Sequence, residues 1–147
     1  MGKTLVLGYG NSLRSDDGIG WVAAEQLMED LADSQVCVIV RQQLMLELAP
    51  QIAQFDRLIL IDAATDRMAG QISVKKVEPA GASFEAYSHH LKPATLLACA
   101  KLMYGSSPET WLVSVGGESF ECNDQLSPTV AAQVPQVLSR VRELIGK

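Results

Sequence analysis

Short apolar runs recur along the chain and predict the strands of a sheet. Most of these runs are rich in β-branched and aliphatic residues, which favour strands. Four of the five are largely apolar, which is typical of strands buried on both faces. The fourth run in chain order alternates instead and predicts a half-exposed antiparallel strand at the edge of the sheet. The runs are Lys3–Leu7, Val36–Val40, Arg57–Ile61, Gln71–Val77 and Thr110–Val115.

Apolar residues at helical spacing predict helices between these strands. Ile19–Leu31 is expected to bury Trp21, Ala24, Met28 and Leu31. Leu44–Gln54 predicts a short helix that Pro50 interrupts late, and Pro93–Tyr104 predicts a helix with proline in its first turn.

The last predicted helix opens at Ser127-Pro128, a cap residue followed by proline, and Pro135 is expected to kink or restart it. Its apolar face consists of Val130, Val134, Val137, Val141 and Leu144.

Strands and helices alternate from one end of the chain to the other, which predicts an α/β fold. We expect a single domain over residues 1–147, with a twisted, mostly parallel five-stranded sheet and helices on both faces. In such folds the ligand site lies beyond the carboxyl ends of the strands. The loops after Leu7, Val40, Ile61 and Val115 are therefore the places to look for chemistry.

Composition narrows the range of partners. The net charge of −5 repels phosphate backbones, so we expect no nucleic acid partner. No apolar run is long enough to span a bilayer and no targeting signal is visible, so we expect a soluble, cytoplasmic protein.

Cys37, Cys99 and Cys122 show no C-x-x-C spacing; we expect them to be reduced and buried.

The loop after the first predicted strand carries adjacent carboxylates. Gly8-Tyr9-Gly10 resembles the start of a dinucleotide fingerprint, but Leu13 stands where the third glycine is needed. Asp16 and Asp17 would also repel a pyrophosphate at the start of the helix. Either residue can cap the helix, and function remains as good an explanation as capping. Our interpretation is that Asp16 caps or orients the loop while Asp17 points into the cleft.

Two further groups are expected near the same edge of the sheet. Asp62 directly follows the apolar run Arg57–Ile61, where it can either form a turn or take part in chemistry. His89 and His90 lie in a loop before a helix, where a histidine is often simply solvated. Two carboxylates and one imidazole nevertheless form a plausible divalent-metal triad. Neither H-E-x-x-H nor G-x-S-x-G is present, which disfavours helical zinc peptidases and serine hydrolases.

Together these segments resemble the hydrogenase maturation peptidases. GYGNSLRSDDGIG resembles their opening motif, RLILIDA their second acidic motif and SHHLKPATLL their histidine loop. The segment Leu126–Val130 resembles the start of their last helix. The resemblance covers essentially the whole chain, with the motifs in the family's order. It implies a twisted sheet flanked by helices.

The resemblance also implies a reaction. The enzyme would be an endopeptidase that removes the C-terminal extension of the [NiFe] hydrogenase large-subunit precursor after nickel insertion. Asp17, Asp62 and His89 would bind the metal, with His90 as the alternative histidine. We expect the nickel to arrive with the precursor, and we expect no organic cofactor. The protein would work as a monomer.

The chain departs from the family at two places. Many relatives have Glu where Asp17 stands, and many have Asp-Gly-Gly where this chain has Arg41-Gln42-Gln43. The second difference leaves the type of hydrogenase open, since that loop can contact the substrate.

In the expected mechanism, a metal held by three side chains polarises the peptide carbonyl and lowers the pKa of a bound water toward ~7. Asp16 would serve as a base or orient the metal ligands. Three other readings remain: a metal-dependent peptidase with another substrate, a non-catalytic metal-binding or chaperone module, and an anion- or nucleotide-binding domain.

Overall fold

The computed structural model describes residues 2–80 and 91–147. His89 and His90, in the loop predicted before the helix that starts at Pro93, lie outside the described residues. The strands are β1 Thr4–Tyr9, β2 Val36–Arg41, β3 Arg57–Ala64, β4 Ile72–Val77 and β5 Glu109–Gly116. The α-helices are α1 Ile19–Asp30, α2 Ala49–Ile52, α3 Pro93–Tyr104, α4 Pro128–Ala131 and α5 Val134–Ile145. Two 3₁₀ turns, η1 Ser15–Gly18 and η2 Leu46–Leu48, precede α1 and α2.

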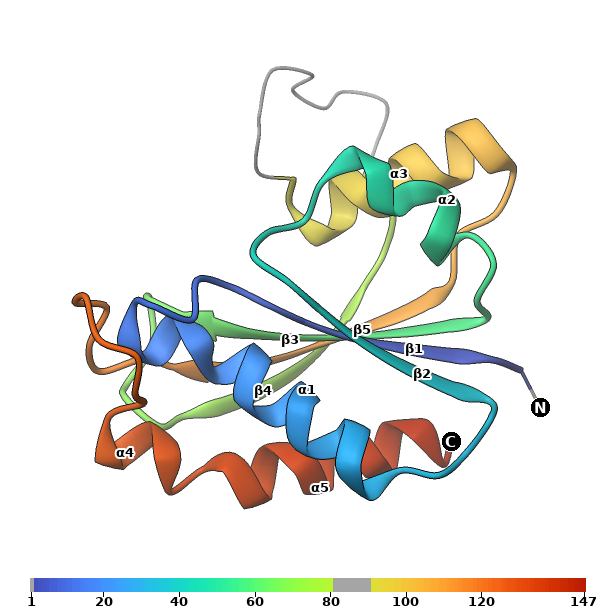
Figure 1. The fold of residues 1–147 in the computed structure, drawn as a ribbon. Coiled ribbons are helices and arrows are strands. Elements are labelled where there is room, and N and C mark those ends of the chain that lie inside the picture. The colour runs from blue at the N-terminus through green and yellow to red at the C-terminus, as the bar shows by residue number, and fades with distance from the viewer. Residues whose placement is uncertain (1, 81–90) are drawn as a thin grey trace.

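The five strands form one sheet in the order β2-β1-β3-β5-β4 (Figure 1). The strands β1, β2, β3 and β5 are parallel, whereas β4 runs antiparallel to β5. This arrangement confirms the predicted α/β class, with a mostly parallel sheet and one antiparallel edge strand. Since the four parallel strands point the same way, the loops after β1, β2, β3 and β5 all start from one edge of the sheet.

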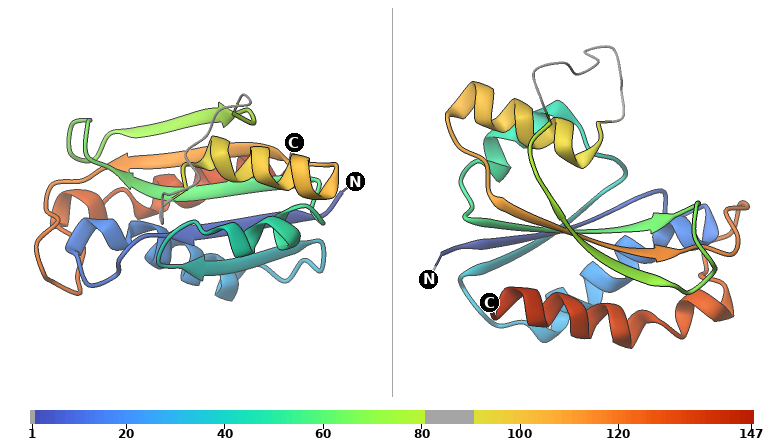
Figure 2. Two further views of the ribbon diagram at one scale, coloured as in Figure 1. Left: turned by 90° about the horizontal axis from the view of Figure 1, so that it is seen from above. Right: turned by 180° about the vertical axis from the view of Figure 1, so that it is seen from behind.

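Helices cover both faces of the sheet because neighbouring residues of each strand point to opposite sides. On one face, Val6, Ile59 and Ile61 pack against α1 and α5. On the other face, Leu5 and Leu60 pack against α2 and α3. Figure 1 shows α2 and α3 above the sheet with α1 and α5 below it, and Figure 2 shows the same layers from above and from behind. Each fully buried aliphatic side chain contributes roughly 1.5–3 kcal/mol.

The predicted end of the chain is confirmed. The five apolar residues expected on the face of the last helix are all buried. Pro135 lies in the first turn of α5, so it restarts the helix after α4. The Ser127 hydroxyl accepts a hydrogen bond from the Val130 N–H and so caps α4.

The predicted buried face of α1 is confirmed for Ala24 and for Leu31, which packs against the core, and is wrong for Trp21 and Met28. The residues that face the sheet are Ile19, Gly20, Ala23, Ala24 and Leu27, whereas Met28 is 43% exposed and Trp21 is only partly buried. The physical reason is close approach. A Cβ at Gly20 would collide with the Ile61 carbonyl oxygen and the Tyr9 backbone, so small residues line the contact and the large ones lie on its flank.

Three smaller expectations also need correction. Pro50 lies in the first turn of α2 and does not interrupt a longer helix. The strand β3 runs two residues beyond Asp62, because Asp62 and Ala64 still pair with β5. Cys37 and Cys122 are exposed and only Cys99 is buried; Cys37 lies on an outermost strand, where the helices do not cover it fully.

Within residues 2–80 and 91–147, no helix has both the length and the apolar character needed to cross a membrane.

Candidate functional site

Asp62 lies near the carboxyl end of the central strand β3. Its neighbour on β5 is Ser114, and the pairing of Gly8 with Ile61 places Tyr9 beside it on β1. One Asp62 carboxylate oxygen accepts a hydrogen bond of 2.7 Å from the Ala63 N–H. The side chain is therefore fixed by its own strand, at the edge from which the loops of the predicted site start.

Tyr9 is a site residue that the sequence reasoning did not single out. Its hydroxyl donates a hydrogen bond to the Asp62 carboxylate. Burial raises the pKa of Tyr9 above its ordinary value, and the charge of Asp62, the hydrogen bond to it and the charge of Asp17 raise it further. Tyr9 thus stays protonated and acts as a donor. The position of Tyr9 at the end of the first strand, between two glycines, was the sequence signal that could have identified it.

Asp17 lies on the 3₁₀ turn η1, in the loop after β1. Its carboxylate accepts a hydrogen bond of 2.6 Å from the Asn11 N–H. Gly10 has a φ of 139°, and a Cβ there would collide with the Asp17 carbonyl oxygen. A glycine is therefore needed at position 10 to let the loop fold back onto the turn that carries Asp17.

Asp17 lies close enough to Asp62 for its charge to affect the pKa of Asp62. Burial is the largest influence on the pKa of Asp62 and raises it to about 7, while the bonds from Ala63 and Tyr9 act to lower it. The charge of Asp17 raises this pKa further. Two carboxylates that repel each other in a partly buried setting form a natural position for a cation.

Asp16 points away from this pair and holds a distant loop. Its side chain is fully buried, and its oxygens accept bonds from the N–H groups of Glu118 at 2.8 Å, Ser119 at 2.9 Å and Ser127 at 2.7 Å. The Ser127 hydroxyl adds a bond of 2.8 Å. Burial acts to raise the pKa of Asp16, but the bonds from Ser119, Ser127 and Glu118 outweigh it and hold the pKa below its ordinary value.

The loop after β2 connects two parts of this edge. The Arg41 carbonyl oxygen accepts bonds from the Gly10 N–H at 3.2 Å and the Trp21 indole N–H at 3.2 Å. The Leu44 carbonyl oxygen accepts a bond of 3.2 Å from the Leu91 N–H. A pocket beside the loop is lined by Arg41, Gln43, Met45, Glu47, Leu48 and Gln51. The segment that starts at Arg41 thus adjoins the loop that carries Asp17.

The third expected ligand cannot be placed. His89 and its alternative His90 lie outside the described residues. In the part of the chain that the structure describes, no group of three or more His, Cys, Asp or Glu side chains is arranged to hold a metal ion. The structure therefore describes the positions of Asp17 and Asp62, and the metal site with His89 stays a prediction.

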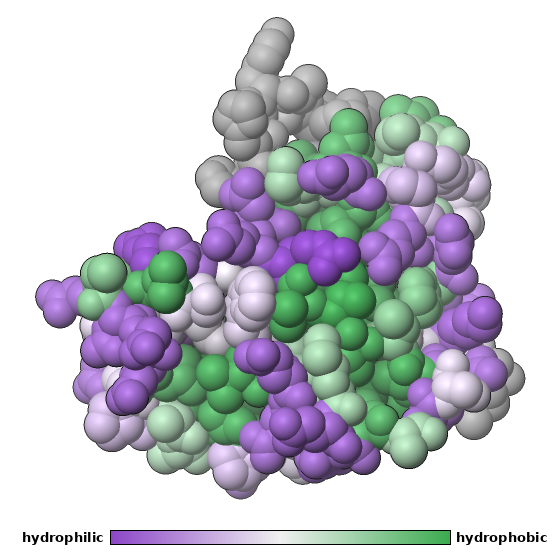
Figure 3. All heavy atoms as spheres, in the orientation of Figure 1, coloured by the Kyte–Doolittle hydropathy of each residue, from purple (hydrophilic) through white to green (hydrophobic). Residues whose placement is uncertain are grey.

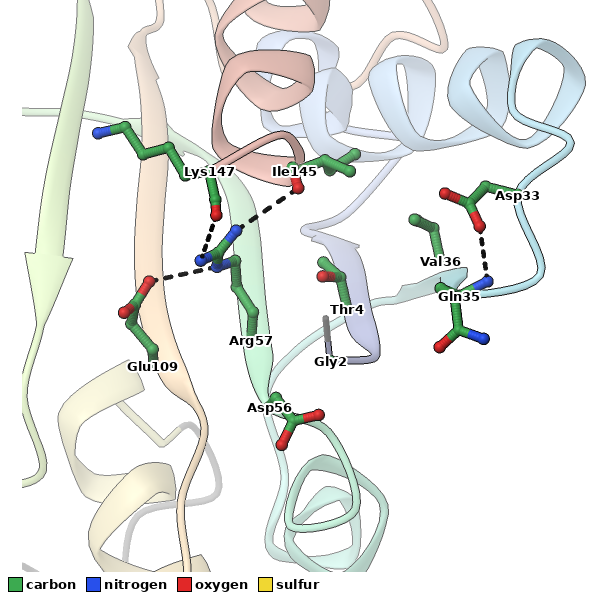
Figure 4. Close-up of a pocket in the computed structure, with 10 residues that line it drawn as sticks. All are labelled: Gly2, Thr4, Asp33, Gln35, Val36, Asp56, Arg57, Glu109, Ile145 and Lys147. Carbon is green, nitrogen blue, oxygen red and sulfur yellow. Dashed lines mark hydrogen bonds and ion pairs between the residues drawn. The ribbon is translucent and has the colours of Figure 1, made fainter.

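A larger pocket lies at the opposite edge of the sheet, where the parallel strands begin (Figure 4). Its polar groups are largely paired with each other. Arg57 forms an ion pair of 3.2 Å with Glu109 and donates to the carbonyl oxygens of Ile145 at 3.5 Å and Lys147 at 3.2 Å. Asp56 accepts a bond of 2.9 Å from the Lys3 N–H. The bonds from Arg57 to the carbonyl oxygens attach the end of the C-terminal helix to the sheet, so we assign this pocket a structural role.

Comparison with known proteins gives a consistent result. The chain is 30% identical to the hydrogenase 2 maturation protease of Escherichia coli K12, over 96% of this chain and 92% of the relative. Among solved structures, it resembles the hydrogenase maturating endopeptidase HybD from E. coli, with 28% identity and a TM-score of 0.79 over 95% of this chain and 89% of that one.

A more distant structure shares the fold. The [NiFe] hydrogenase maturation protease HycI from Thermococcus kodakarensis is 21% identical, with a TM-score of 0.78 over 99% of this chain and 93% of that one. No protein-family model matches the chain.

Proposed function

The chain belongs to the hydrogenase maturation proteases and is an endopeptidase, and from that premise we propose that it removes the C-terminal extension of a [NiFe] hydrogenase large-subunit precursor after nickel insertion. The observation that supports this most directly is the pair Asp17 and Asp62. These carboxylates share one edge of the sheet, and each is held by a backbone N–H. Their mutual repulsion is relieved when a cation binds between them.

Nickel is, in this proposal, part of the substrate. Carboxylate and imidazole ligands suit a nickel ion, and His89 would complete the set with Asp17 and Asp62. Three such ligands form a modest site, which suits an enzyme that recognises nickel already bound in its precursor. Cleavage would then depend on nickel, and a precursor without the metal would stay intact. We propose that the protein acts in the cytoplasm, as a monomer.

The residues around the pair have separate tasks in this proposal. The Tyr9 hydroxyl and the Ala63 N–H orient the Asp62 carboxylate, and the Asn11 N–H orients Asp17. Nickel that arrives with the precursor would supply a Lewis acid at the scissile carbonyl. Asp16 holds the loop of residues 118–127 and does not suit the role of a base, because its oxygens already accept hydrogen bonds and its lowered pKa makes it a weak proton acceptor.

Single substitutions test the assignment of the site. Nickel-loaded precursor is incubated with the Asp17→Asn, Asp62→Asn, His89→Ala and His90→Ala variants, and its intact mass is followed. We expect the first three to leave the precursor at full length and His90→Ala to process it. If only the His90 variant is inactive, the histidine assignment moves by one residue. Full processing by all of the first three overturns the proposed site.

A further inference from the structure

The two outer strands of the sheet, β2 and β4, differ in how they are protected against pairing with another strand. Exposed edge strands are usually protected by charges, prolines or bulges, because their free backbone groups can pair with another chain. On the outer strand β4, Lys75 and Lys76 are both exposed. The outer strand β2 has the sequence VCVIVR, with neither lysine nor proline and no charge before Arg41.

The hydrogen bonds to β1 determine which backbone groups of β2 face outward. Thr4 N–H donates to the Gln35 carbonyl at the start of β2, and Gly10 N–H donates to the Arg41 carbonyl at its end. Because alternate residues of a strand face opposite neighbours, the N–H and C=O groups of Val36, Val38 and Val40 point away from β1.

Two of these outward residues retain free groups. The Val36 N–H donates to Asp33 and the Val40 carbonyl accepts from the Arg41 side chain. Among residues 2–80 and 91–147, neither the N–H nor the C=O of Val38 has a hydrogen-bond partner, and the Val40 N–H has none either.

Apolar surface accompanies this open edge. Trp21 and Met28 lie seven residues apart on α1 and so share one face of the helix. Trp21 donates to the Arg41 carbonyl, which places that face along β2. The partial exposure that contradicted the predicted core of α1 thus gives β2 an apolar rim. Figure 3 shows apolar surface along the course that β2 follows in Figure 1.

The outer side of β2 also ends beside the candidate functional site. The end of β2 is bonded through Arg41 to Gly10, in the loop that carries Asp17. Neighbouring strands lie about 4.8 Å apart, so the distance from a strand added outside β2 to Asp62 on β3 is roughly 14 Å. About four extended residues of a peptide cover that distance, at ~3.4 Å each.

We propose that the outer edge of β2 receives an extended segment of the peptide substrate as an added strand. The enzyme is an endopeptidase, so an extended peptide is the ligand its chemistry requires, and β-strand addition provides affinity through main-chain hydrogen bonds. The apolar rim would receive alternate side chains of the segment. The identity of that peptide, the C-terminal part of the hydrogenase precursor, rests on the proposed function.

A proline substitution at Val38 tests the added strand. Val38→Pro removes an outward donor and leaves the bonds to β1 intact, so the fold is expected to survive. One lost main-chain bond should raise KM for nickel-loaded precursor about three- to tenfold with kcat nearly unchanged. The matched control Val38→Ala keeps the N–H and should lie closer to the original enzyme. Unchanged KM in a folded Val38→Pro variant overturns the proposal.

Hydrogen exchange of the unsubstituted enzyme provides a second test that does not depend on the variant. The Val38 and Val40 amides should exchange rapidly in the free enzyme and slowly with a saturating synthetic peptide matching the C-terminal part of the precursor. The Ile39 amide, which faces β1, should be protected in both. Absence of peptide-dependent protection, or protection that depends on enzyme concentration because a second copy pairs with β2, overturns the proposal. If the peptide protects both amides but the enzyme does not shorten the precursor, the proposed function fails and the edge assignment stands.

Discussion

Replacement of Asp62 by asparagine should stabilise the fold by an amount that grows with pH. The pKa of Asp62 is about 7 in the folded protein, against an ordinary value of 3.8 for an aspartate carboxyl. The folded state therefore binds the proton more tightly than the unfolded state between these two values. The free energy of unfolding of the original protein consequently falls as pH rises from 3.8 to about 7 and then levels off. An amide cannot ionise, so the variant lacks this loss.

The magnitude follows from the two pKa values. With 1.36 kcal/mol for each pKa unit, the contribution of Asp62 to the unfolding free energy changes by about 2–3 kcal/mol between pH 5 and pH 8. The stability difference between Asp62→Asn and the original protein should grow by this amount over that interval. Changes in hydrogen bonding to Ala63 and Tyr9 shift the difference by a constant and leave its pH dependence in place.

Urea unfolding at pH 5, 6, 7 and 8 measures this difference, with the midpoint and slope determined for each protein. Asp66→Asn is the matched control, because the Asp66 side chain is 85% exposed on the loop after β3. The stability difference between Asp66→Asn and the original protein should stay the same from pH 5 to pH 8. A flat difference for Asp62→Asn as well would contradict the prediction, since the folded protein would then place no penalty on the ionised Asp62.

Three further substitutions test the support around the pair. Tyr9→Phe removes a hydrogen bond that lowers the pKa of Asp62, so the pH at which this carboxyl titrates by NMR should rise, with a loss of about 0.5–1.5 kcal/mol in urea unfolding. Asp16→Asn places an amide against N–H donors and should lower stability at pH 7 by about 3 kcal/mol; because the pKa of Asp16 is lowered, this difference should shrink as the pH falls below 3.8. Gly10→Ala should lower the melting temperature more than Gly105→Ala, because both glycines have positive φ but only Gly10 faces a collision.

Hydrophobic periodicity was sufficient to predict the fold because most elements of the core follow it. The strands β1, β3 and β5 are buried on both faces, and α5 is apolar on one side only, so their patterns are unambiguous. Periodicity failed for α1, where close packing through Gly20 and Ala24 outweighs side-chain size. Periodicity records which residues are apolar, and the distance between a helix and its sheet decides which of them are buried.

The candidate site was predictable in outline and not in detail. Asp17 and Asp62 were expected at one edge because the loops after parallel strands meet there. The hydrogen bond from Tyr9 was not expected, since it depends on the register between β1 and β3. The hydrogen bond from the Ser127 N–H to Asp16 joins residues 111 positions apart, and no local sequence pattern indicates it.

The intact mass of a hydrogenase large-subunit precursor shows directly whether this enzyme cleaves it and whether cleavage depends on nickel. The unsubstituted enzyme is incubated with precursor that carries nickel and, in a parallel reaction, with the same precursor stripped of nickel. We expect that only the nickel-loaded precursor loses a C-terminal peptide, which appears as a second mass. Equal shortening of both precursors would contradict the recognition of nickel, and no shortening of either would contradict the proposed substrate.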